Sequence, residues 1–396
     1  MVDTSTAAGK GTRLTGIDVA RSFALFGMMA THILTGPGSD EGAMGAIHEA
    51  AGGRAAALFA VLAGAGLALA SGGDRPTPEK VSRTRRTTLV RSVALVALGL
   101  TLGMIETPVA IILAYYGLLF LVAIPVLQWR ARSLTAAAVA AALATPVVSY
   151  WLRGDQGLEE SAGDNLEWSS LGEFAHVVRH LLLTGYYPVL TWTAYLFAGL
   201  AVGRLALRDQ RVAALVAGIG AALAAGAWAV STIAVRAAGG FGALIDNDLL
   251  TRYSVNGRTP NDGFYGTSPV NDPWWLLVRI AHSGSITDLV HTIGTSMLVL
   301  GLTLLAVRPI QRVGRVPLRM LAAAGSMTLT LYCLHVVAVG LNSSGFGDPL
   351  VPVWPFLVLN IVGAVVIALL WGAPDRRGPV EDAIAITAGA ATRDQR

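Results

Sequence analysis

Hydrophobic residues run through this chain in long stretches, each about as long as a helix that crosses ~30 Å of hydrocarbon. This pattern predicts an all-α bundle of about ten transmembrane helices. The predicted ranges are 15–34, 54–72, 89–106, 109–128, 133–151, 183–204, 212–235, 288–307, 320–341 and 351–371. Three longer polar connectors, at 35–53, 152–182 and 236–287, fall on the same side when the crossings alternate.

Composition agrees with a protein embedded in lipid. Of the 396 residues, 54% are apolar and 14% are charged, whereas an average globular protein has about 25% charged residues. The single cysteine, Cys333, excludes an intrachain disulfide and a cysteine-based zinc or iron–sulfur site, because each needs more than one thiolate. We expect neither a bound metal nor a nucleic-acid partner.

Charge divides unevenly between the two sides of the predicted bundle. The formal net charge is only +4, but most of the 29 Lys and Arg residues share the side of the N-terminus, and most of the 25 Asp and Glu residues lie opposite. The positive-inside rule then places both termini in the cytoplasm. The predicted organisation is a cytoplasmic tail at 1–13, one transmembrane domain at 14–375, and a second cytoplasmic tail at 376–396.

Cationic side chains on the cytoplasmic side are candidates for binding an anionic donor. Arg83, Arg85 and Arg86 lie between the second and third predicted helices. Orientation in the membrane explains such residues in general, but each also contributes about 1 kcal/mol toward an anionic partner near the surface. Asp18 and Arg21 share a face of the first helix, where mutual neutralisation is the main expectation and contact with the donor is the alternative.

All seven histidines fall in outer connectors or in the outer halves of predicted helices. Imidazole is the side chain whose ordinary pKa suits proton transfer near neutral pH. The histidines are His32, His48, His176, His180, His282, His291 and His335. The proton chemistry of this protein is therefore predicted on one side of the membrane.

His48 is the first candidate catalytic residue, in a predicted loop of small residues that enters the second helix. The neighbouring Glu49 is a carboxylate that could orient its ring, and Arg54 is a candidate substrate contact. A solvated loop histidine is the alternative. His32 is the second candidate, because an ionisable group in an apolar helix usually faces a cavity or a partner; a packing role is its alternative.

Further candidate substrate contacts lie at the start of the eighth predicted helix. Asp288 and His291 are three residues apart and share a helix face, so we expect the carboxylate to orient the imidazole. His282 lies just before them. A Ser-His-Asp hydrolase is disfavoured, because the sequence has no nucleophile elbow.

Several short segments resemble bacterial YeiB-type membrane proteins, namely 13–22, 58–64, 185–192, 324–332 and 377–381. The first half also resembles the catalytic region of heparan-α-glucosaminide N-acetyltransferase. The resemblance implies a transmembrane acyltransferase that takes an acetyl group from cytoplasmic acetyl-CoA and delivers it to an amine or hydroxyl of a sugar on the other side. His48 stands at the position of the family's catalytic histidine.

The charge pattern favours the same function for an independent reason. CoA carries several phosphates, so the basic face would recruit it, while the candidate bases lie on the other face. We therefore expect an acetyl-CoA-dependent acyltransferase in the bacterial cytoplasmic membrane, surrounded by lipid and acting on an envelope glycan or glycolipid. His48 would deprotonate the acceptor or carry the acyl group transiently, and the protein would be a monomer or a homodimer.

A transporter or flippase for an anionic or lipid-linked solute is the alternative function. It too would use Asp18, Arg21 and His32 within the membrane. Two observations disfavour it: the sequence shows no pair of similar halves, which many secondary transporters have, and the histidines do not form a relay across the bilayer.

Overall fold

The computed structural model describes residues 13–35, 42–155, 165–239, 264, 266–343 and 349–393, and all regular structure within them is helical. Most of the predicted N-terminal tail and parts of the outer connectors 35–53, 152–182 and 236–287 lie outside the described residues. The remainder confirms the predicted polytopic helical membrane fold.

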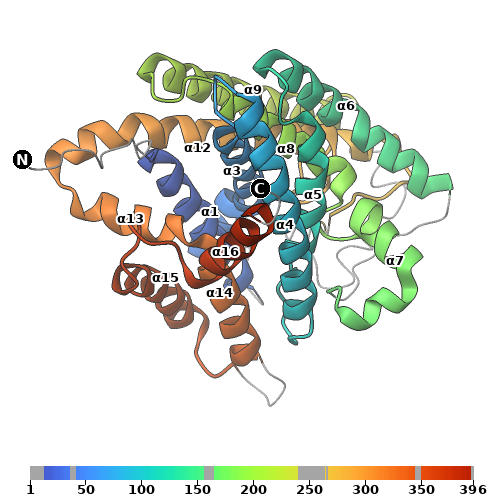
Figure 1. Ribbon diagram of the computed structural model, residues 1–396. Helices are drawn as coiled ribbons and strands as arrows, with labels where there is room; N and C mark the ends of the chain where they lie inside the picture. Colours follow the sequence, from blue (N-terminus) through green and yellow to red (C-terminus); the bar gives the residue numbers. More distant parts are fainter. Residues whose placement is uncertain are drawn as a thin grey trace, which may run out of the picture.

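The helices surround a common core, and the C-terminal helix lies across the front of the bundle in Figure 1. In chain order they are α1 (Thr15–Ile33), α2 (Gly42–Ala51), α3 (Arg54–Ala70), α4 (Pro78–Gly103), α5 (Leu113–Val126), α6 (Ala131–Asp155), η1 (Trp168–Glu173), α7 (Phe174–Arg179), η2 (His180–Thr184), α8 (Val189–Gly203), α9 (Gln210–Arg236), η4 (Pro273–Leu277), α12 (Ile286–Val313), α13 (Val316–Ser326), α14 (Thr328–Ser343), α15 (Val353–Leu370) and α16 (Pro379–Arg393).

Within the described residues, six helical segments are long and apolar enough to cross a membrane: α2 together with α3, α4, α6, α9, α12 and α15. The bent pair α13 and α14 makes a seventh if it is one span, and α5 and α8 are shorter apolar helices. Every predicted hydrophobic stretch contains a helix. The count of ten crossings and the cytoplasmic termini remain predictions.

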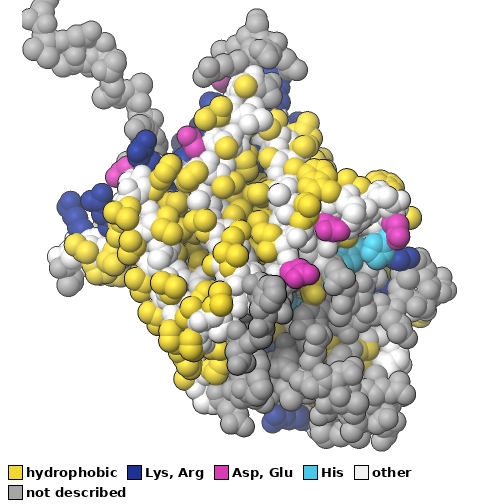
Figure 2. Space-filling view, turned by 90° about the horizontal axis from the view of Figure 1, so that it is seen from below, with side chains coloured by type: hydrophobic (Ala, Val, Ile, Leu, Met, Phe, Trp, Pro, Cys, Tyr) yellow, Lys and Arg dark blue, Asp and Glu magenta, His cyan; other side chains and the backbone are white. Residues whose placement is uncertain are grey.

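The outer surface of the bundle is apolar where lipid would meet it. Exposed large hydrophobic side chains line α6, α9 and α15, among them Val139, Leu143, Leu215, Ile233, Leu359 and Val362. Figure 2, which views the molecule from below Figure 1, shows a broad area of hydrophobic side chains, with several Lys and Arg at its upper and left edges and histidine at its right. Basic side chains also lie beside the histidines on this face, as Arg179 does beside His176, so the predicted division of charge between two sides stays a prediction.

At the centre of the bundle, α3 and α8 approach so closely that their contact tolerates only glycine. A Cβ atom on Gly199 would collide with the carbonyl oxygen of Val61, and one on Gly64 would meet the backbone of Leu196 and Leu200. In lipid, helices gain little from hydrophobic burial against one another, so close van der Waals packing of this kind holds them together.

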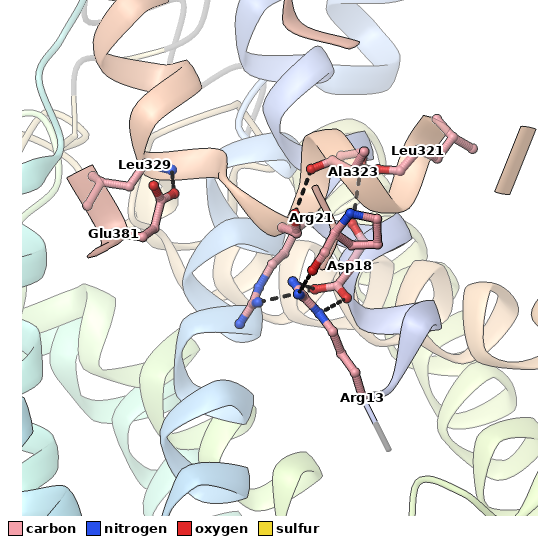
Figure 3. A network of polar contacts seen from close by, with 10 residues as sticks. Arg13, Asp18, Arg21, Leu321, Ala323, Leu329 and Glu381 are labelled. Atoms are coloured by element: carbon pink, nitrogen blue, oxygen red, sulfur yellow. Dashed lines mark hydrogen bonds and ion pairs between the residues drawn. The ribbon is translucent and has the colours of Figure 1, made fainter. Parts of the chain in front are cut away.

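The predicted single helix at 320–341 is wrong, because the chain bends by 76° between α13 and α14. The bend exposes the first N–H groups of α14, which have no partner within the helix. Glu381 of α16 supplies a hydrogen-bond acceptor for them (Figure 3). Its carboxylate accepts hydrogen bonds from the backbone N–H of Leu329 at 2.8 Å and from the Thr330 hydroxyl at 2.5 Å. The C-terminal helix thereby fixes the direction of α14.

Replacing Gly199 with alanine is expected to destabilise the protein by about 1–3 kcal/mol, the usual cost of overpacking a close contact. The control is Gly218→Ala on α9, where an added Cβ meets no atom within 4 Å and alanine adds helix propensity. Thermal unfolding of both variants in detergent measures the difference. Equal melting temperatures for the two would contradict the packing described for α3 and α8.

Candidate functional site

Three helices meet through polar side chains near the C-terminal end of α1. Nδ1 of His32 lies 3.1 Å from Nε2 of His335 on α14, and the two rings are nearly parallel, at an interplanar angle of 13°. Nδ1 of His335 lies 3.0 Å from Oδ1 of Asn360 on α15. His335 is only 2% exposed, whereas His32 is half-buried, so His32 is the more accessible of the two.

His48 lies on the short helix α2 and not in the predicted loop, because the small residues around it continue a helical turn. Its Nε2 is hydrogen-bonded to the carbonyl oxygen of Leu34, just beyond α1. A carbonyl only accepts, so Nε2 carries the hydrogen and Nδ1 keeps a free lone pair. The predicted orientation by Glu49 is wrong: the side chain of Glu49 is exposed, and its backbone oxygen accepts a bond from Arg54.

Arg54 begins α3 and reaches the start of α12. Its Nε lies 3.3 Å from Nε2 of His291, and Nδ1 of His291 lies 2.9 Å from the carbonyl oxygen of Ala224. Asp288 instead accepts the backbone N–H of Gly284 at 3.3 Å. The expected orientation of His291 by Asp288 is therefore wrong, since a backbone carbonyl and a guanidinium hold this imidazole.

His282 lies in the loop before α12, with a positive φ of 57°. Its ring meets Tyr187 edge to face at 5.9 Å, and burial lowers the pKa of His282 to about 4. The turn between α2 and α3 packs against the same loop, because a Cβ on Gly53 would come within 3.4 Å of the His282 backbone nitrogen. His32, His48, Arg54 and His282 thus gather at one end of the bundle.

His180 is a buried histidine whose two ring nitrogens have no hydrogen-bond partner among the described residues. Its ring lies 6.1 Å from that of Tyr115 and 5.7 Å from that of His176. Burial, and then the nearby His176 and Arg179, lower the pKa of His180 to about 4. The sequence places His180 beside the membrane but gives no signal that it is buried.

At the other end of α1, the predicted pairing of Asp18 with Arg21 is confirmed at 3.5 Å. Figure 3 shows a second guanidinium on the same carboxylate, that of Arg13, at 2.5 Å. The carboxylate of Asp18 is 4% exposed and the side chain of Arg21 is 30% exposed. Asp18 is therefore occupied by cations and orients Arg21, which is the member of the pair that an anion can reach.

Arg91 of α4 belongs to the same cationic cluster, which we define as Arg21, Arg91 and Arg377. Arg91 is within electrostatic range of Arg21, Arg377 and Glu381, and its guanidinium lies 5.6 Å above the ring of Phe120. Arg91 was not among the candidate residues predicted from the sequence, although a cation inside an apolar stretch is by itself a signal of function.

The predicted donor residues on α4 divide into two groups. Arg85 holds α4 to the end of α5, because its guanidinium donates to the carbonyl oxygen of Ile124 at 3.1 Å and to Oε1 of Gln128 at 2.9 Å. Arg83 and Arg86 are exposed and remain available to attract an anion at longer range.

A row of aromatic rings leads from the cationic cluster into the bundle. Phe120, beneath Arg91, lies 6.2 Å from Tyr116, and Tyr116 lies 5.6 Å from Phe59. The hydroxyl of Tyr116 is buried and has no hydrogen-bond partner within the described part of the chain. Tyr116 is in turn in electrostatic range of Tyr187, which touches His282. Aromatic side chains therefore connect the two ends.

The fold and these two polar ends define a helical membrane protein with cations at one end of α1 and imidazoles at the other. Residues 13–231 match the family described as heparan-alpha-glucosaminide N-acetyltransferase, catalytic. Since the match covers more than half of the 396 residues, the chain belongs to this family of transmembrane acetyltransferases. No curated protein matches the chain.

The matched region begins at Arg13 and ends within α9. It contains most of the groups described above: Asp18, Arg21, His32, His48, Arg54, Arg91, Tyr116 and His180. His335, Asn360 and Glu381 lie beyond it. Among the described residues, no group of three or more His, Cys, Asp or Glu side chains could hold a metal ion.

Acidification is expected to destabilise the fold through His180. Its pKa is about 4 in the folded state and about 6.5 in an unfolded chain, so below pH 6.5 the unfolded state binds the extra proton. The free energy of unfolding then falls by about 2 kcal/mol between pH 7 and pH 5. Thermal unfolding of His180→Phe across this range should lose about 2 kcal/mol of the pH dependence and keep the part due to His282, whose pKa burial lowers in the same way, while His176→Phe should keep nearly all of it. A pH dependence unchanged in His180→Phe would contradict the account.

Proposed function

We propose that the protein transfers an acetyl group from acetyl-CoA, bound at its basic end, to a hydroxyl or amine of an extracytoplasmic sugar or glycolipid at its histidine end. One observation carries this proposal: within a member of an acetyltransferase family, a single helix presents a reachable guanidinium at one end and a reachable imidazole at the other. Arg21 and His32 are eleven residues apart on α1, which corresponds to about 16 Å along the axis.

The cationic cluster suits the phosphates of CoA. Guanidinium groups bind phosphate oxygens through paired, charge-assisted hydrogen bonds, and Arg21, Arg91 and Arg377 approach from three separate segments. Asp18 and Arg13 restrain Arg21 before the donor binds. Arg83 and Arg86 add attraction at longer range. Of the donor residues expected from the sequence, Arg21 is the one that the geometry favours most.

The row of aromatic rings suits the arm of CoA that carries the thioester. Pantetheine is a flexible, largely apolar chain with two amide groups, so it can lie along Phe120 and Phe59. The unpartnered hydroxyl of Tyr116 can donate to one of those amides and so recover the hydrogen bond that a buried polar group otherwise lacks.

At the histidine end, His48 presents a free Nδ1 lone pair beside the end of α1. In our proposal this nitrogen deprotonates the acceptor or carries the acetyl group between donor and acceptor. Arg54 and His282 lie where they can contact the acceptor, whereas His291 and Asp288 support Arg54 and the loop before α12. Residues 240–263 and 265 of the long connector lie outside the described residues.

Replacing His48 with alanine is expected to lower acetyl transfer by about 10²–10⁴-fold, the usual contribution of a general acid or base. Binding of acetyl-CoA should persist, because His48 lies near the C-terminal end of α1 and the cationic cluster lies near the other end of this helix. Transfer of labelled acetyl groups and calorimetric binding of acetyl-CoA measure the two effects in purified protein, with His176→Ala as the control. Retained transfer would remove His48 from the mechanism, and solute uptake by proteoliposomes without CoA would favour a transporter.

Arg91→Gln is expected to raise KM for acetyl-CoA about 10- to 100-fold with little change in kcat, because one charge-assisted hydrogen bond to phosphate contributes about 1.5–3 kcal/mol. The control is Arg132→Gln, which removes an exposed arginine at the start of α6. Steady-state kinetics of both variants at the same ionic strength provide the test. Equal KM values in Arg91→Gln and the control would exclude Arg91 from the donor site.

A further inference from the structure

The contacts of Asn360 fix the direction of a hydrogen-bond chain through α15, α14 and α1. Nδ2 of Asn360 donates to the carbonyl oxygen of Phe356 at 2.9 Å. A carbonyl cannot donate, so the amide nitrogen must point toward Phe356 and the amide oxygen toward His335. Oδ1 of Asn360 lies 3.0 Å from Nδ1 of His335, and this oxygen only accepts. Nδ1 of His335 therefore carries a hydrogen.

The same logic continues to His32. In a neutral imidazole one nitrogen donates and the other accepts, so Nε2 of His335 accepts, and its partner 3.1 Å away, Nδ1 of His32, donates. Nε2 of His32 is then left with a lone pair. The hydrogen bond that the His32 ring makes among the described residues is the one to His335, and His32 is half-buried whereas His335 is 2% exposed. The chain therefore ends in a proton acceptor on the more accessible of the two rings.

The surroundings favour the neutral forms that this assignment requires. His335 is 2% exposed within an apolar helix, where a charged imidazole would be costly. His335 and His282 are the titratable groups in electrostatic range of His32. The other titratable groups at this end are His48 on α2, Arg54 on α3, and Asp288 and His291 on α12.

We propose that Asn360 and His335 are positioning residues that hold His32 as the proton acceptor for acetyl transfer, an inference that rests on the proposed function. As the acceptor oxygen bonds to the thioester carbonyl carbon, its proton passes to Nε2 of His32. The carbon–sulfur bond breaks, and His32 returns the proton to the departing sulfur, which gives the acetylated acceptor and the free thiol of CoA. If His48 carries the acetyl group, the carbon–sulfur bond breaks as Nδ1 of His48 takes that group. The acceptor oxygen then bonds to the acetyl carbon and displaces His48, and the acceptor's proton passes through His32 to the CoA thiolate.

The sharpest test is Asn360→Asp, which keeps the acceptor oxygen but adds a negative charge beside His335. The charge stabilises a protonated imidazole pair, so the acidic limb of the kcat/KM profile should move up by about one pH unit, while transfer at alkaline pH stays within tenfold of the parent value. The matched control is Asn342→Asp: Asn342 lies on α14 and is hydrogen-bonded to the backbone of Val351, so its variant should keep the parent profile.

A second variant covers the case in which the added carboxylate prevents folding. His335→Gln should lower kcat at least tenfold and leave KM for acetyl-CoA unchanged, because it breaks the chain to His32 without touching the cationic cluster. An unmoved acidic limb in Asn360→Asp, or a parental kcat in His335→Gln, would overturn the positioning role and leave His48 as the base. Absence of acetyl transfer from the parent protein itself would instead reject the proposed function.

Discussion

The hydrogen bonds between Glu381 and the start of α14 hold together the part of the molecule on which its chemistry depends. A helix that begins within an apolar bundle exposes N–H groups that lipid cannot satisfy. Glu381 satisfies those of Leu329 and Thr330 and, as an anion, also complements the positive end of the helix dipole. Because α14 can start at this point, it runs at a steep angle to α13, and His335 comes to lie beside His32.

The first helix joins the two ends of the proposed reaction. Its N-terminal end presents Arg21, restrained by Asp18, and its C-terminal end presents His32, restrained by His335. Arg21 is held by a neighbour on the same helix and His32 by a residue distant in sequence, so both are oriented before any ligand binds. Such preorganisation lowers the cost of ordering side chains when substrate arrives. In our account the protein contributes two restrained ends and an aromatic connection between them, while CoA supplies the reactive thioester.

Local patterns in the sequence predicted what depends on neighbouring residues. Hydrophobic runs located the helices, and a spacing of three residues predicted the ion pair of Asp18 with Arg21. Contacts between distant segments were not predictable in this way. The bend at Met327 interrupts an apolar stretch, and its cap, Glu381, comes about fifty residues later. His32 and His335 are separated by about three hundred residues, and nothing in either local sequence indicates the other.

Some errors came from treating neighbours in sequence as partners in space. Glu49 follows His48, and Asp288 precedes His291 by one helical turn, yet backbone carbonyls hold both imidazoles.

The sidedness of the two polar ends is the central claim, and membrane vesicles of opposite known orientation test it directly. With labelled acetyl-CoA on one side and a sugar acceptor on the other, we predict labelled product only when acetyl-CoA is on the side of Arg21 and Arg91. Product formed when acetyl-CoA is confined to the side of His32 and His48 would contradict the account.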